Sequence, residues 1–244
     1  MSIILNRRSD LTLENCRKVA WGGEAVQWGD QAGAAIARAR ADFLRLITRE
    51  DITIYGVNTG YGHQARKRLT PEERQAQAQL PTHHRAASWG DPLPERVTRA
   101  IVFARLANII EGHAALSPHV AEGVVAMLTG GPLPIVPARG QGGAGEILSL
   151  SHLFLDLTNR LELAEKDMLS LINGSPAASA LVADAALAAR SRIEVVADIF
   201  ALTAEAFNAP LGHFAEELKT LWNNPHDAWG LAALRTRIDR KSVV

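Results

Sequence analysis

Residues 54–62 read IYGVNTGYG, and this short run carries most of the information about the fold. Its glycines let the backbone turn sharply and approach a ligand closely. Residues 53–55 are β-prone and predict a short strand that ends in this turn. Tyr55, at the lip of the loop, has the chemistry of a general base. The glycine spacing differs from the phosphate-binding G-x-G-x-x-G pattern, and a tight turn with Tyr55 packed in the core is the structural alternative.

Composition points to a folded, helix-rich chain. The 244 residues are 47% hydrophobic and only 5% aromatic, which favours helices over a β-sandwich. Lys and Arg number 26, as do Asp and Glu, so no basic excess indicates a nucleic-acid or membrane partner. The single cysteine, Cys16, cannot form an internal disulfide. The N-terminus has no signal-peptide pattern, and we expect a cytoplasmic protein.

The spacing of apolar residues predicts a series of helices along the chain. A polar helix over residues 71–79 has Thr70 as its cap and Pro71 at its first position. The remaining helices are predicted near residue 14 and over residues 34–48, 94–111, 118–128, 147–158, 161–171 and 176–207. Residues 132–145 form a glycine- and proline-rich loop, too long for a passive linker in a compact domain.

Two further motifs hold side chains that could bind a ligand. Residues 82–93 read THHRAASWGDPL, and the adjacent histidines point apart, so we predict no metal site. His84 is able to hydrogen-bond a hydroxyl, and Arg85 to meet an anion or to form an ordinary salt bridge. Residues 169–175 read LSLINGS, where Asn173 either contacts a ligand or ends a helix together with Gly174.

Together these stretches resemble the N-terminal half of the histidine and aromatic amino-acid ammonia-lyases. The resemblance runs in order through residues 54–62, 82–93, 136–153 and 169–175. It implies a mainly α-helical fold: a globular active-site domain over residues 1–145, then the start of a long central helix bundle over residues 146–238. It also implies a chain truncated to about half the family's length, and a homotetramer. We interpret residues 239–244, DRKSVV, as a non-native tail, with a short natural tail as the alternative.

The resemblance also implies roles for individual residues. Tyr55 matches the base that removes the β-proton of the amino acid, with Asn58 beside it in the substrate loop. Asn173 matches the asparagine that hydrogen-bonds the family's prosthetic group. His84 and Arg85 fall on the two selectivity positions but match neither the histidine-specific nor the tyrosine-specific pair. The implied substrate is a small molecule more polar or more acidic than tyrosine.

The prosthetic-group loop departs from the family at the position that matters most. In the family, Ala-Ser-Gly cyclises and loses water to give a methylidene-imidazolone electrophile. Alignment on residues 145–146 and 151–153 places this triad on Gly143, Ala144 and Gly145. Alanine has no hydroxyl to lose, so we expect no methylidene-imidazolone and no other cofactor.

Three functional hypotheses follow from these residues. The first is an ammonia-lyase-like enzyme that abstracts a β-proton and eliminates without the methylidene-imidazolone group. The second is a non-catalytic paralogue that serves as a binding or assembly subunit. The third is an ordinary ammonia-lyase whose triad lies elsewhere in the loop. Whether the chain is an enzyme stays open at this point.

Overall fold

The computed structural model describes residues 2–49, 51–80, 82–140 and 143–238, so the tail predicted at residues 239–244 lies outside the described residues. The chain divides into two compact units, Met1–Asp184 (unit 1) and Ala185–Val244 (unit 2). This division lies inside the long helix Pro176–Ala206. The boundary that the sequence suggests at residue 145 stays a prediction.

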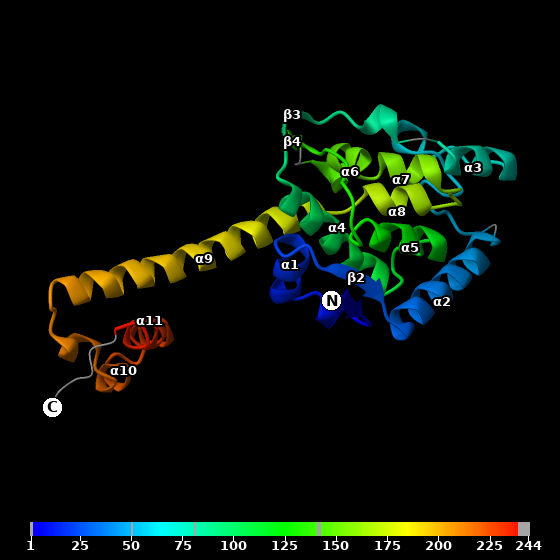
Figure 1. Cartoon of the computed structure of the whole chain (residues 1–244). Helices are drawn as coiled ribbons and strands as arrows, with labels where there is room; N and C mark the ends of the chain where they lie inside the picture. The colour runs from blue at the N-terminus through cyan, green and yellow to red at the C-terminus, as the bar shows by residue number, and fades with distance from the viewer. Residues whose placement is uncertain (1, 50, 81, 141–142, 239–244) are drawn as a thin grey trace. The chain divides into compact units, whose positions relative to one another are not determined.

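The described residues are mainly helical, as predicted, with two small sheets in unit 1 (Figure 1). One sheet pairs β1 and β2 in parallel, and the other pairs β3 and β4 antiparallel. The strands are β1 (Ser2–Leu5), β2 (Ala25–Trp28), β3 (Trp89–Pro92) and β4 (Pro137–Arg139). The helices are α1 (Leu13–Ala20), α2 (Asp30–Ile47), α3 (Pro71–Ala78), α4 (Glu95–Ile110), α5 (Pro118–Ala126), α6 (Ile147–Leu153), α7 (Leu155–Arg160), α8 (Asp167–Ile172), α9 (Pro176–Ala206), α10 (Glu217–Trp222) and α11 (Pro225–Arg235).

The helix starts follow local capping chemistry. Thr12 caps α1 by accepting a hydrogen bond from the Asn15 backbone nitrogen. Thr70 and Glu73 form a reciprocal capping box at the start of α3, where Pro71 fills the first position. These side chains satisfy backbone N–H groups that have no partner inside the helix.

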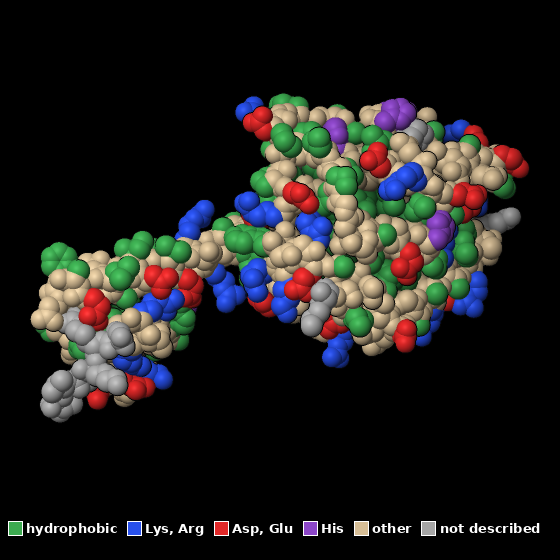
Figure 2. All heavy atoms as spheres, in the orientation of Figure 1, with side chains coloured by type: hydrophobic (Ala, Val, Ile, Leu, Met, Phe, Trp, Pro, Cys, Tyr) green, Lys and Arg blue, Asp and Glu red, His purple; other side chains and the backbone are tan. Residues whose placement is uncertain are grey.

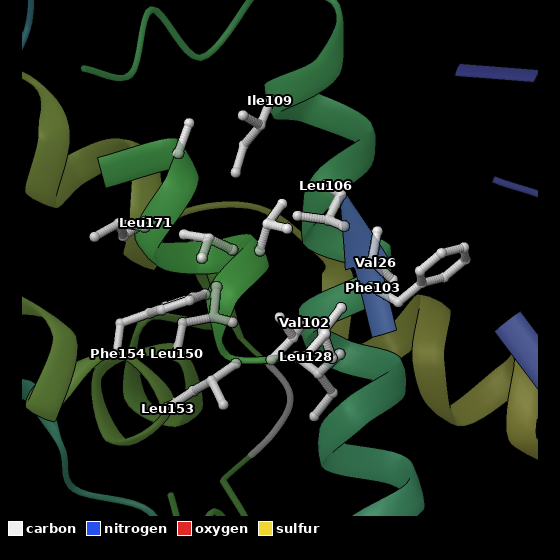
Figure 3. Close-up of a cluster of buried hydrophobic side chains, with 14 of the residues drawn as sticks. Val26, Val102, Phe103, Leu106, Ile109, Leu128, Leu150, Leu153, Phe154 and Leu171 are labelled. Atoms are coloured by element: carbon white, nitrogen blue, oxygen red, sulfur yellow. The ribbon is translucent and has the colours of Figure 1, made fainter. Parts of the chain in front are cut away.

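Helix α4 forms the centre of unit 1. It contacts α1, α2 and α5, and its side chains are buried on almost every side. Figure 3 shows Val102, Phe103, Leu106 and Ile109 of α4 among apolar side chains from other elements. Those labelled in the figure are Val26, Leu128, Leu150, Leu153, Phe154 and Leu171. Burying this apolar surface is the main favourable term in folding.

Three local predictions from the sequence were wrong. Residues 53–55 form no strand, because the Asn58 amide bonds the Ile54 nitrogen at 2.7 Å and the Ile52 carbonyl at 2.8 Å and so holds this segment in a turn. The helix predicted over residues 147–158 is broken at Phe154 into α6 and α7. The next helix begins only at Asp167, because Lys166 has a left-handed backbone with φ of 75°.

The predicted helix over residues 176–207 is confirmed as α9, which begins in unit 1 and continues into unit 2. Within unit 2, Arg237 forms ion pairs with Glu194 and Asp198 of α9. Residues 167–206, which span α8 and α9, contain the one stretch of the described chain with the length and apolar composition of a membrane-crossing segment, a test that core helices also pass.

A buried carboxylate joins three segments of unit 1. Asp167, at the start of α8, accepts hydrogen bonds from the Ser117 nitrogen at 2.8 Å, the Ser117 hydroxyl at 2.7 Å and the Ala164 nitrogen at 2.9 Å. Arg40 of α2 lies 3.7 Å away, and both side chains are almost fully buried. Arg40 also donates to the carbonyls of Ala115 and Glu165.

Substituting this carboxylate is expected to destabilise the chain. Asp167→Asn keeps the side-chain shape but leaves Arg40 buried without its counter-charge, which costs about 3 kcal/mol. The exposed pair Asp42–Arg45 gives a matched control, since Asp42→Asn is expected to change stability by less than about 0.5 kcal/mol. Urea unfolding followed by circular dichroism measures both. Equal effects of the two substitutions would show that the buried cluster contributes nothing special.

Candidate active site

The loop that follows residue 53 holds Tyr55 at the surface and Asn58 in the interior. The Tyr55 side chain is 56% exposed, and its hydroxyl oxygen accepts a hydrogen bond from the Gly62 nitrogen at 3.0 Å. Tyr55 is therefore not packed in the core. Both polar groups of the Asn58 amide are taken up by the backbone of residues 52–54. Asn58 thus shapes the loop here, and its predicted contact with a substrate stays a prediction.

The second tyrosine of the loop lies beside the first. The rings of Tyr55 and Tyr61 meet edge to face with centroids 6.5 Å apart. The Arg85 guanidinium lies 5.4 Å from the centre of the Tyr61 ring, and an Arg85 nitrogen contacts the Met168 sulfur at 3.6 Å. Burial raises the pKa of Tyr61 to about 12, against a smaller opposing effect of Arg85. Arg85 is therefore a neighbour of this tyrosine pair.

The other predicted selectivity residue, His84, lies in the short 3-10 turn His83–Arg85. It is exposed, and its ring meets that of His83 edge to face at 5.6 Å. Partial desolvation, followed by the positive charge of Arg85, lowers the pKa of His84. The turn is fixed to α6 by Thr82, whose hydroxyl donates to the Ser151 carbonyl at 3.3 Å.

The loop predicted to carry the triad ends in a 3-10 turn, Ala144–Glu146. Gly143 and Gly145 have φ of 112° and 70°, and Glu146 is also left-handed with φ of 53°. Such conformations are costly for residues other than glycine and cluster at functional sites. The Glu146 carboxylate accepts hydrogen bonds from the nitrogens of Ala177 and Ala178 at 2.7 and 2.8 Å. It thereby joins this loop to the start of α9.

Asn173 is fitted closely between the loop and α4. The Gly174 nitrogen donates to the Gly145 carbonyl at 3.0 Å. A Cβ on Gly145 would lie 2.8 Å from the Asn173 Oδ1, and one on Gly174 would lie 2.6 Å from an Arg105 nitrogen. Arg105 donates to the Asn173 carbonyl at 2.6 Å. Only glycine therefore fits at either position without movement of its neighbours.

These elements surround a pocket of about 380 Å³ in unit 1. Its walls come from the tyrosine loop, from α4 and the turn after it, and from α8. The described residues that line it are Tyr55, Arg105, Asn108, His113, Ala114, Lys166, Leu169, Ser170 and Asn173. The structure thus brings Tyr55 and Asn173 together, whereas Asn58, His84 and Arg85 are not among its described lining residues.

Two charged lining residues were missed from the sequence. Arg105 lies in α4, between otherwise apolar positions, and is 2% exposed. Desolvation lowers its pKa to about 10, so it remains protonated at neutral pH. An arginine in a strongly apolar helix was the available signal, since such a charge is rarely buried without a specific role. Lys166 gave no comparable signal, because its placement depends on a backbone turn.

The described residues contain no group of three His, Cys, Asp or Glu side chains arranged to hold a metal ion. Cys16 is buried and unpaired. Burial raises the pKa of its thiol, with a smaller effect of Asp184 in the same direction. Cys16 lies on α1 and is not among the pocket's described lining residues.

The curated proteins most similar to this chain in the comparison include several histidine ammonia-lyases. The histidine ammonia-lyase of Geobacillus thermodenitrificans is 32% identical over 237 residues, covering 87% of this chain and 46% of the relative. That of Streptococcus gordonii is 28% identical over 236 residues, covering 86% and 46%. The chain therefore spans about half the length of the curated relatives it matches.

Solved structures share the fold. Ergothionase from Treponema denticola, solved with desmethyl-ergothioneine sulfonic acid, has a TM-score of 0.84 at 20% identity and covers 100% of this chain and 54% of its own. Tyrosine aminomutase from Streptomyces globisporus has a TM-score of 0.83 at 25% identity, covering 97% and 49%. The family model for aromatic amino acid lyases matches residues 11–162 and 157–244. The chain, whose matched segments take in almost all of its length, belongs to the aromatic amino acid lyase family.

Proposed function

We propose that this chain carries the proton-abstracting side of an ammonia-lyase-like site, and that it acts on an amino acid or related small molecule without a methylidene-imidazolone group. The observation that carries the proposal is the meeting of Tyr55 and Asn173 in one pocket beside a loop whose predicted triad has Ala144 at its centre. The relatives are ammonia-lyases that act on amino acids, which supports this substrate class.

The residues present do not fit the prosthetic group. Its exocyclic methylene would come from a serine side chain at position 144, where this chain has alanine. The next serines, Ser149 and Ser151, lie in α6 and are buried. The Ser149 hydroxyl donates to the Glu146 carbonyl, so it belongs to the helix rather than to the loop.

Without that electrophile, the chemistry must use a C–H bond that the substrate's own carbonyl has acidified. With Tyr55 present as the phenolate, its oxygen would take the proton and become the neutral phenol, and the electron pair of the C–H bond would form a double bond as the leaving group departs with its electrons. The Gly62 N–H contact fixes the phenol, which helps to hold it toward the pocket. Arg105 and Lys166 in the same pocket would stabilise negative charge that develops on the substrate.

A non-catalytic binding or assembly subunit is the second candidate, because Ala144 by itself removes the family's electrophile. The resemblance also implies a homotetramer. Unit 2 supports association of copies, since Val195, Ile199 and Leu202 lie on one face of α9 and each is more than half exposed. Figure 2 shows hydrophobic side chains on the surface of α9. A cytoplasmic location accords with the bacterial metabolic relatives.

Loss of the Tyr55 hydroxyl is expected to abolish turnover. Tyr55→Phe removes the base and should lower kcat/KM at least about 100-fold for any substrate that the chain turns over. Absorbance of the unsaturated product, measured over a panel of aromatic and acidic amino acids and hydroxy acids, tests this. Tyr61→Phe is the matched control, because it removes the chain's only other phenol and leaves Tyr55 in place.

Two results would contradict the proposal. Turnover that survives Tyr55→Phe would exclude this base, and a complete lack of turnover in the wild-type chain would favour the non-catalytic paralogue. Mass spectrometry of the peptide spanning residues 139–148 tests the third hypothesis, in which the chain is an ordinary ammonia-lyase whose triad lies elsewhere in the loop. We expect no dehydration there, whereas a dehydrated peptide would restore an ordinary ammonia-lyase.

The half-buried Tyr61 is expected to make the chain sensitive to alkali. Its pKa lies at about 12 in the folded chain and near 10.0 when unfolded, because burial disfavours the phenolate. The folded state therefore keeps the proton longer, and the stability from Tyr61 is present below pH 10 and lost as the pH rises toward 12. Urea unfolding across this window should show a smaller decline in Tyr61→Phe than in the wild type. An identical decline would exclude Tyr61 as its source.

Association through unit 2 has a direct test. Ile199→Arg places a charge within the exposed apolar face of α9 and should shift the chain toward the monomer in light scattering. Ser191→Arg adds the same charge to an exposed position of the same helix without removing apolar surface. A monodisperse wild-type monomer, or equal effects of both substitutions, would contradict the homo-oligomer.

A further inference from the structure

The pocket beside Tyr55 has a positive wall. Arg105 and Lys166 line it, and none of its described lining residues is Asp or Glu. His113 also lines it but lies 3.5 Å from the Glu111 carboxylate, which offsets its charge whenever the ring is protonated. Arg105 and Lys166 are therefore the two uncompensated cations of the pocket. Figure 2 shows acidic and basic side chains interspersed over the visible surface, so a wall with one sign of charge is a local feature.

The neighbouring carboxylates are already engaged elsewhere. The negative charge of Glu146 acts on Arg105 by raising its pKa. Both oxygens of Glu146, however, accept hydrogen bonds from the start of α9. Asp167 follows Lys166 in the chain, but its oxygens are used by Ser117 and Ala164, with Arg40 nearby. Neither acid forms an ion pair with Arg105 or Lys166 among the described residues.

The two cations also retain unused hydrogen-bonding capacity. Arg105 donates one hydrogen bond to the Asn173 carbonyl, while its buried Nε has no partner in the part of the chain that the structure describes. A buried guanidinium donor without a partner is costly unless a ligand satisfies the group. The Lys166 ammonium has one long contact, 3.5 Å to the His113 carbonyl, and lies 5.1 Å from the centre of the Phe43 ring.

Lys166 is held at the pocket by an unfavourable backbone. Its φ of 75° is left-handed, a conformation that a lysine adopts only where the surrounding structure imposes it. Desolvation, and then the positive charge of Arg40, lower the pKa of Lys166. Both effects would be relieved by a bound anion, which would restore favourable surroundings for the ammonium group.

We propose that Arg105 and Lys166 form an oxyanion subsite that takes a carboxylate, or a similar oxyanion group, of a small molecule in the Tyr55 pocket. The guanidinium offers planar N–H donors, and the ammonium offers a mobile point charge in the same pocket. The pocket volume of about 380 Å³ suits a small molecule rather than a peptide chain. The subsite adds a substrate class to the proposed function. It rests on that function only in assuming that the bound molecule presents its reacting group to Tyr55.

Two probes of equal shape and different charge test this subsite: 3-phenylpropanoate and its neutral amide, 3-phenylpropanamide. Ligand-observed NMR on the 244-residue chain requires only dilute protein. At low salt the carboxylate should bind at least about fivefold more tightly than the amide, the advantage of one charge-assisted contact. Added salt should reduce this preference, because ions screen partly exposed charges.

Substitution at Lys166 supplies the second arm of the test. Lys166→Gln should remove most of the fivefold preference, and Lys166→Arg should retain it. Lys18→Gln on α1, which is not among the pocket's described lining residues, should leave it unchanged. Circular dichroism checks that each variant is folded, and if Lys166→Gln is not, the salt titration of the wild type decides. Equal binding of both probes, or a preference that survives Lys166→Gln, would overturn the subsite.

The result is separable from that of the lyase proposal. Binding is measured without turnover, so Tyr55→Phe should still prefer the carboxylate. A charge preference in a chain that turns over no substrate would leave the subsite standing and remove the catalytic role. Turnover without any charge preference would support the catalytic role and exclude the subsite.

Discussion

The Asp167 carboxylate is the interaction on which the arrangement of unit 1 depends. It binds the start of α5 through Ser117, the turn before α8 through Ala164, and α2 through Arg40. Because these groups are buried, none of them can exchange its partner for water without a large free-energy cost. The hydrogen bond that Asp167 accepts from the Ala164 nitrogen closes the turn that contains Lys166, and Lys166 lines the pocket. A stabilising cluster in the interior thus determines which charge faces the candidate site.

The site itself is assembled by backbone shape more than by side-chain contacts. Both the oxygen and the nitrogen of the Asn58 side-chain amide hydrogen-bond the backbone of the loop that presents Tyr55. Gly145 and Gly174 allow Asn173 to lie against the loop and Arg105 at distances that a Cβ would forbid. The pocket therefore combines an exposed phenol, an amide fixed in place and two cations whose nearest acids are occupied. This combination favours chemistry in which a substrate brings its own negative charge.

The sequence predicted the helical fold and the larger helices because their apolar spacing is a local property. The long helix starting at residue 176 and the capping box at Thr70 follow from residues a few positions apart. The sequence did not predict the turn at residues 53–55, where the Asn58 side chain competes with strand formation, nor the break at Phe154. Tyr55 and Asn173 were found through their motifs. Arg105 and Lys166 were missed because their convergence depends on how α4 and α8 pack.

The Glu146 carboxylate has a consequence for anyone wishing to rebuild this protein. Both Glu146 oxygens accept hydrogen bonds from the first turn of α9, so the segment just before Glu146 is held to that helix at one end. Pairing of β4 with β3 anchors the other end. A residue grafted next to Gly145 would therefore lie close to Asn173, whose side-chain oxygen faces that glycine. Such a graft depends on Glu146, because its two hydrogen bonds hold this end of the loop at the start of α9.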